Sequence, residues 1–132
     1  MDIAEGKSRY FIDLQWFEQT GRSFSVLARS RLCPSCRSQH PSVESAPELL
    51  AKFRDCCSKR DGFLAPGLPL RELIFRLLLS SGNEPLQLQE IATPLKNLLL
   101  EAGDIRDVAA PLLKRIIGGD QYYGLRSFPE EP

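Results

Sequence analysis

The chain of 132 residues has few of the residue types and motifs on which enzymes depend. It contains one histidine, which leaves little means for general-base chemistry near neutral pH. It has no glycine-rich phosphate loop, no serine nucleophile elbow and no HExxH metalloprotease motif. We therefore expect a protein that is not an enzyme and that has no small-molecule substrate.

Long apolar runs and a charge excess are also lacking. The longest apolar candidate, LIFRLLL at 73–79, contains Arg76 and is far shorter than the roughly 20 residues of a membrane span. The polar start MDIAEGKSRY lacks the apolar stretch of a secretory signal, so we expect a cytoplasmic protein with no membrane partner. Basic and acidic residues number 17 each, so a nucleic acid would have to be held by a local patch.

The N-terminal half has the pattern of a β-hairpin followed by one helix. Apolar residues alternate in YFIDLQWF and again in SFSVLARSRL, and the glycine in EQTGR between them suits a turn. Leucines, a phenylalanine and two cysteines share one face of PELLAKFRDCCSK, which predicts a helix that ends near Gly62.

The C-terminal half has helical periodicity in three segments and ends in a strand. We expect helices from LPLRELIFRLLLSSGN, from the residues after a short extended EPLQ, and from APLLKRIIGG, with YYGLRSF as the closing strand. Pro94 either kinks the second helix or begins a new one. The expected fold class is α+β. The expected parts are a flexible tail (1–9), a hairpin and helix with a cysteine site (10–62), a linker (63–69), a second domain (70–128) and a short tail (129–132).

The four cysteines are the clearest candidate site. Cys33 and Cys36 have the two-residue spacer of a zinc knuckle, and Cys56 and Cys57 supply the two further ligands that a tetrahedral zinc ion needs. In a reducing compartment such cysteines serve as metal ligands or free thiols rather than disulfides. His40 is an alternative fourth ligand, and free buried thiols without metal are a third interpretation.

The adjacent pair Cys56–Cys57 leaves the identity of the metal open. Neighbouring side chains on a helix diverge by about 100°, so both can bind one ion only if the helix end is distorted. A [4Fe-4S] cluster is larger and accepts wider sulfur spacing, so it is the alternative cofactor to Zn²⁺.

The segment CPSC also resembles the active-site stretch of glutaredoxin-like oxidoreductases. That motif needs a strand before the cysteines and a helix directly after them. We expect the strand but no helix from RSQHPSVESAP, so a thiol oxidoreductase is the least favoured function.

Residues 69–128 resemble a winged-helix domain. PLRELIFRLLLSSGNEPLQLQEI is similar to its first helix, short strand and second helix, and APLLKRIIGGDQYYGLRSF to its third helix and wing. The resemblance implies a helix-turn-helix whose last helix enters a DNA major groove, with Lys114, Arg115 and Arg126 as contacts. However, residues 69–132 hold 7 basic and 9 acidic residues, so protein contact or dimerisation is the alternative.

The N-terminal half is more favourable to nucleic acid electrostatically. No acidic residue occurs from Gln19 to Val43, whereas Arg22, Arg29, Arg31 and Arg37 do. Arginines hold phosphates, and aromatic residues beside them stack on bases, although the alternating aromatic residues also suit a buried face. We therefore expect a metal-binding protein with a regulatory role that binds DNA or RNA, with a protein-interaction module or homodimer as the alternative.

Overall fold

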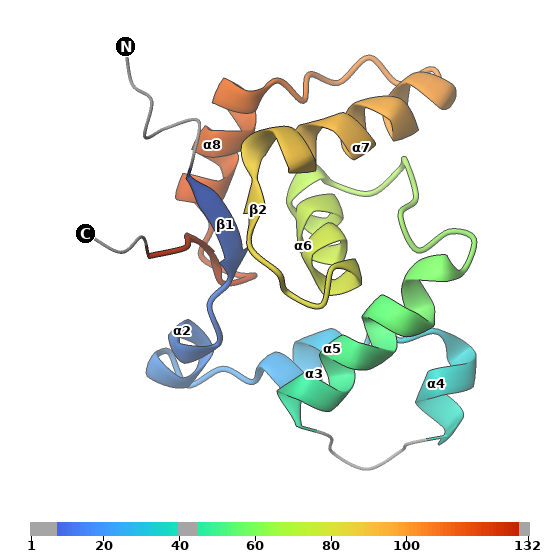
Figure 1. The fold of residues 1–132 in the computed structure, drawn as a ribbon, viewed down its shortest axis with the longest axis vertical. Helices are drawn as coiled ribbons and strands as arrows, with labels where there is room; N and C mark the ends of the chain where they lie inside the picture. The colour runs from blue at the N-terminus through green and yellow to red at the C-terminus, as the bar shows by residue number, and fades with distance from the viewer. Residues whose placement is uncertain (1–7, 40–44, 130–132) are drawn as a thin grey trace.

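The computed structural model describes residues 8–39 and 45–129, and these form a mixture of helices and short strands (Figure 1). The elements are β1 (Arg9–Ile12), α2 (Leu14–Gln19), α3 (Phe24–Arg29), α4 (Pro34–Gln39), α5 (Ala46–Asp55), the 3-10 helix η1 (Cys57–Lys59), α6 (Leu70–Ser80), β2 (Leu86–Gln87), α7 (Leu88–Glu101), α8 (Ala110–Gly118) and β3 (Leu125–Ser127). The described residues thus combine seven α-helices with one three-stranded antiparallel sheet, which is compatible with the α+β class.

The N-terminal β-hairpin expected from the sequence is wrong. Only Arg9–Ile12 is a strand, and the rest of the segment forms the short helices α2 and α3. The reason lies in two capping residues, because the Asp13 side chain accepts the Gln15 N–H and the Ser23 side chain accepts the Val26 N–H. In α3 the alternating pattern is replaced by a helical face, and Val26 is 71% exposed instead of buried.

Strand β1 forms the centre of the sheet, in the order β2-β1-β3. It pairs antiparallel with both neighbours, with Tyr10 opposite Leu86 on one side and Ile12 opposite Leu125 on the other. Figure 1 shows blue β1 beside yellow β2 and the red C-terminal segment. A strand from the N-terminal end of the chain therefore completes the sheet of the C-terminal half.

The helices and strand expected in the C-terminal half are confirmed as α6, α7, α8 and β3. Helix α7 is continuous through Pro94, which removes one backbone donor without ending the helix. Glu90 and Gln87 form a capping box at its start. Within the described ranges, no helix has the length and apolar character needed to cross a bilayer. The likeness to a winged-helix domain remains an expectation.

One hydrophobic cluster contains buried residues from both halves of the chain. Helix α5 contributes Leu49 and Phe53, and α6 contributes most of its length, including the fully buried Phe75. Contacts of α5 with α3 and with α6 bring the cysteine-bearing segments against this cluster.

Asn83 connects the turn after α6 to the central strand. Its backbone has a φ of 65°, in the left-handed region that asparagine tolerates better than most residues. Its side-chain Oδ1 accepts the Ile12 N–H at 2.8 Å, and its Nδ2 donates to the Ile12 carbonyl at 2.9 Å. The amide thus satisfies the Ile12 backbone as a neighbouring strand residue would.

Replacement of Asn83 by alanine should lower the free energy of unfolding by about 2–3 kcal/mol. Two hydrogen bonds are worth about 1 kcal/mol each, and alanine at a positive φ adds strain of about 1 kcal/mol. Urea unfolding measures the loss. Asn83→Gly removes both hydrogen bonds, but glycine adopts the positive φ without strain. Its free energy of unfolding should therefore lie between those of Asn83→Ala and the wild type. An Asn83→Ala protein as stable as wild type would contradict this role.

Candidate metal centre

The CPSC segment lies at the start of α4. The sequence did not predict a helix at this position. Cys33 directly precedes Pro34, the first residue of the helix, and Cys36 lies in its first turn. The expectation that no helix follows the two cysteines is therefore wrong for residues 37–39. The residues before them form helix α3 and not the expected strand, so the strand-then-helix order of a glutaredoxin-like site does not occur here.

The adjacent cysteines lie where α5 ends. Helix α5 stops at Asp55, and Cys56 has φ −132° and ψ −65°, outside helical geometry. Cys57 then begins the 3-10 helix η1. This break is the local distortion that two neighbouring cysteines need if both are to face one ion.

Three sulfur atoms come together at this point. The ligand atoms of Cys33, Cys36 and Cys57 lie within 4.8 Å of one another, and all three residues are buried. The Cys57 Sγ lies 3.4 Å from the Cys33 Sγ, and the Cys33 backbone N–H donates to the Cys57 Sγ at 3.3 Å. These three residues can hold a metal ion.

Cys56 lies at the edge of this group. Its Sγ is 3.9 Å from the Cys33 Sγ, but it is not one of the three mutually close sulfurs. It is also the only partly exposed cysteine of the four. The fourth predicted ligand thus contacts the cluster without completing it in this conformation. The alternative ligand His40 lies outside the described residues.

The thiols have unequal acidities. Burial acts to raise the pKa of Cys33, but hydrogen bonds from the Cys36 backbone and from the neighbouring thiols outweigh it and lower the pKa to about 7. Burial raises the pKa of Cys36 and of Cys57. One thiolate, that of Cys33, is therefore favoured at the centre of the metal-free cluster.

Four of the arginines predicted to bind nucleic acid have partners inside the protein. Arg31 forms a bidentate pair with the buried Glu72, and Arg37 donates to the carbonyls of Ser30 and Leu32. Arg22 donates to the Tyr122 carbonyl, and Arg126 to those of Asp120 and Leu125. Among the other predicted contacts, Arg29 on α3 is half-buried, and Lys114 and Arg115 on α8 are exposed.

Sequence reasoning missed the interactions of two charged residues, Glu72 and Arg60. Glu72 accepts hydrogen bonds from Arg31, Arg76 and the Tyr123 hydroxyl. A hydrogen bond to the Cys56 sulfur raises the pKa of the exposed Arg60. The spacing of Glu72 and Arg76, four residues apart in an otherwise apolar helix, was a visible signal for the first of these.

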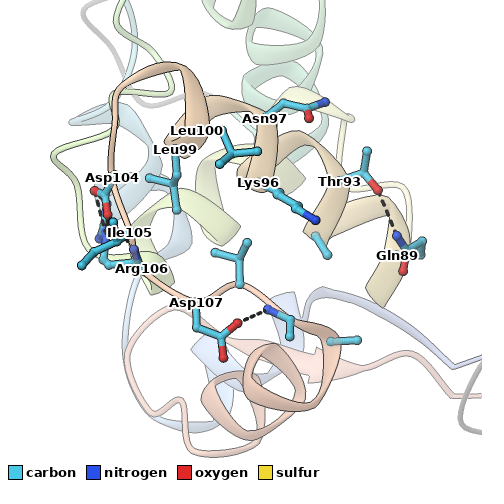
Figure 2. Close-up of a pocket in the computed structure, with 14 residues that line it drawn as sticks. Gln89, Thr93, Lys96, Asn97, Leu99, Leu100, Asp104, Ile105, Arg106 and Asp107 are labelled. Atoms are coloured by element: carbon cyan, nitrogen blue, oxygen red, sulfur yellow. Dashed lines mark hydrogen bonds and ion pairs between the residues drawn. The ribbon is translucent and has the colours of Figure 1, made fainter.

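A groove of about 840 Å³ lies away from the cysteines, between α7 and the segment that leads into α8 (Figure 2). Leu100 and Ile105 line it and are 63% and 99% exposed. Figure 2 shows Lys96 and Thr93 along its α7 side and Asp107 near the start of α8.

Comparisons of this chain with protein-family models, curated proteins and solved structures found no match.

Proposed function

We propose that the protein binds one zinc ion through Cys33, Cys36, Cys56 and Cys57, and that the ion has a structural role. The observation that carries this proposal is the way α4 is attached. Among residues 34–38 of α4, only Cys36 is buried, and Cys33 directly precedes the helix. A helix of this length is not stable by itself in water, so it needs an anchor. A metal ion bound to these cysteines supplies one.

The sulfur spacing favours a single ion. Four thiolates at about 2.3 Å from one zinc lie about 3.8 Å from each other. The measured separations of 3.4 Å and 3.9 Å from Cys33 are close to that value. An iron–sulfur cluster spreads its ligands over several iron atoms and therefore needs wider spacing. Cys56 lies at the distorted end of α5, and its Sγ is 3.9 Å from the Cys33 Sγ, so it is the fourth ligand of the proposed site.

Metal analysis with cobalt substitution tests the proposal. We expect one zinc per chain after anaerobic purification, and intense visible bands with Co²⁺, as tetrahedral thiolate coordination produces. Cys57→Ser should abolish the bands, because Cys57 is fully buried in the cluster. Ser58→Ala, the neighbouring residue in η1, is the matched control. A brown protein containing iron would favour the cluster instead, and a metal-free protein that gains no cobalt bands would reject the site.

The winged-helix-like half has a second candidate role, in protein contact. The observation that favours it is the pair of exposed apolar side chains, Leu100 and Ile105, on the groove of Figure 2. Large apolar side chains gathered on a groove are typical of interaction sites. The exposed side chains of α8 that suit DNA are Lys114 and Arg115, and Gly118 and Gly119 follow them. Major-groove readout through α8 therefore has weaker support than protein contact.

A further inference from the structure

The outward face of the sheet has a row of alternating arginines and aromatic rings. We call it the arginine–aromatic row, and its members are Arg9, Phe128, Arg126, Trp16, Arg22 and Tyr122. These residues are all exposed or half-buried, and the Tyr122 ring is 48% exposed. Figure 1 shows β1 and the red C-terminal segment on the opposite side of the fold from α4, so the row is separate from the cysteines.

The register of the strands produces one end of the row. Tyr10 and Ile12 of β1 are buried, so Arg9 and Phe11 point to the opposite face. The Phe128 ring contacts both, with its centroid 5.0 Å from the Arg9 guanidinium and 5.0 Å from the Phe11 ring. Phe11 in turn lies opposite Arg126 on β3, which places Arg126 on the same face.

The other end of the row is formed by α2 and the turn before β3. The Arg126 guanidinium lies 5.1 Å from the centre of the Trp16 ring. The Arg22 guanidinium lies 5.5 Å from Trp16 and 4.3 Å from Tyr122. Trp16 therefore separates two guanidinium groups, and Tyr122 presents its ring at the end.

Four cation–π pairs occur in this one row. The described residues hold four more, among them Arg31 over Phe75 and Arg76 over Phe63, whose arginines pair with the buried Glu72. The row differs from those two pairs because none of its own residues is buried.

The row is positively charged. Asp120 lies near it, 4.0 Å from Arg126, but its side chain is 0% exposed. The Asp120 carboxylate accepts backbone N–H groups of Tyr122, Tyr123 and Leu125, so it is committed to the turn. Three guanidinium groups thus lie in the row, with the buried Asp120 beside Arg126 and the half-buried Asp13 at the start of the helix that carries Trp16.

The arginines are also held in place. Arg22 donates to the Tyr122 carbonyl at 2.7 Å, and Arg126 donates to the Asp120 carbonyl at 3.0 Å. A guanidinium has five N–H donors, so each of these arginines keeps donors beyond those used in these bonds. Phosphates of a chain that lies along the row could accept from them.

We propose that the arginine–aromatic row binds single-stranded nucleic acid. Arg9, Arg22 and Arg126 hold successive phosphates, and unpaired bases stack on the outer rings of Tyr122 and Phe128. Stacking on exposed rings requires base faces that a duplex hides, which is why the single strand is the preferred form. An acidic polypeptide would satisfy the arginines but would make no use of the rings.

Trp16 makes the test direct, because it is the only tryptophan of the chain. We would titrate the full-length protein with 15-nucleotide oligo(dT), oligo(U) and a hairpin duplex of equal length, and follow Trp16 fluorescence. We expect quenching by both single strands and at least about tenfold weaker binding of the duplex. With three phosphate contacts, log K should fall with log salt concentration with a slope of about −2.

Matched variants locate the binding. Tyr122→Ala should weaken binding at least about fivefold, and Tyr122→Phe should retain it, because the ring and not the hydroxyl stacks. Arg9→Gln should weaken binding and reduce the salt slope, whereas Lys96→Gln on α7 removes the same charge and should change nothing. Thermal melts confirm that each variant is folded.

Three results would overturn the proposal. The first is no binding at low salt by the wild-type protein. The second is tighter binding of the duplex, lost in Arg115→Gln, which would place binding on α8. The third is equal competition by poly-glutamate, which would identify an acidic polypeptide as the partner. The proposal does not depend on zinc binding. Metal analysis of the same sample therefore shows whether the nucleic-acid proposal, the zinc proposal or both have failed.

Discussion

Replacing Glu72 with glutamine is expected to lower the free energy of unfolding by about 3–5 kcal/mol. The Glu72 carboxylate is buried, and both of its oxygens accept from Arg31, at 2.7 Å and 2.8 Å. It also accepts from the Arg76 Nε at 2.7 Å and from the Tyr123 hydroxyl at 2.8 Å. A neutral amide cannot balance two half-buried guanidinium groups, so their charges would be left without compensation.

The same carboxylate should make stability depend on pH in acid. Burial acts to raise the pKa of Glu72, but the hydrogen bonds from Arg31, Arg76 and Tyr123 outweigh it and lower the pKa to about 2. A carboxylate with a lowered pKa stabilises the fold above its unfolded value, 4.5, and this contribution is lost as the pH falls toward 2. The contribution is about 3 kcal/mol.

Urea unfolding of the wild type and of Glu72→Gln at pH 6, 4 and 2.5 measures both effects. The gap between the two proteins should be largest at pH 6 and should narrow steadily in acid. Glu84→Gln, an exposed glutamate in the turn before β2, is the control and should change stability by less than about 0.5 kcal/mol. A Glu72→Gln protein within 1 kcal/mol of wild type at pH 6, or a gap that stays constant with pH, would contradict this account.

This network gives Arg31 a partner that the sequence did not indicate. Arg31 lies in a stretch without acidic residues, which suggested a surface for phosphates. Its carboxylate partner is 41 residues away on α6, and no local pattern connects the two. The buried pair joins the segment before Cys33 to α6, and Tyr123 adds the turn before β3.

The elements that the sequence predicted well are those whose own pattern is strong. Helices α6, α7 and α8 have leucine and isoleucine at helical spacing over nine residues or more, so the buried face is evident without knowledge of partners. Three of the four cysteines expected at one site, Cys33, Cys36 and Cys57, lie together. The two-residue spacer between Cys33 and Cys36 made the closeness of that pair evident from the sequence.

The elements that were predicted badly from the sequence are those that depend on partners distant in the chain. Helices α2 and α3 have six residues each, and over such a length alternating apolar residues suit a strand as well as a helix. Their caps and their packing decide between the two. Strand β1 pairs with residues 86–87 and 125–127, which no hairpin turn could have indicated. The end of α4, residues 37–39, was likewise assigned to a loop because a six-residue helix has little pattern of its own.

Removal of the proposed metal is expected to loosen α4 and η1 while the helices of the C-terminal half stay folded. Binding energy at a structural zinc site is folding energy, and it reaches about 10–16 kcal/mol in small domains that have no other core. The buried cluster includes Cys33, Cys36 and Cys57, but Phe75, Leu95 and most of its other members are apolar residues that bind no metal, so the rest of the cluster should remain packed. The effect should therefore be local.

Hydrogen exchange with and without a strong chelator measures this difference. Amide protection in 33–39 and 56–60 should fall at least about 100-fold on chelation, because the N–H groups of Cys33 and Arg37 are held in the knuckle. Protection in α6 and α7 should change by less than about threefold, since these helices bind no metal and are buried by apolar residues.

The variant Cys33→Ser distinguishes the effect of losing the ion from any other effect of the chelator. Cys33 contacts the sulfurs of both Cys56 and Cys57, so its loss should give the chelated exchange pattern even when zinc is present. Ser58→Ala should exchange as the wild type does in both conditions. Equal protection of 33–39 with and without the chelator would mean that packing of the four thiols alone anchors α4, and the structural role of the metal would then be wrong.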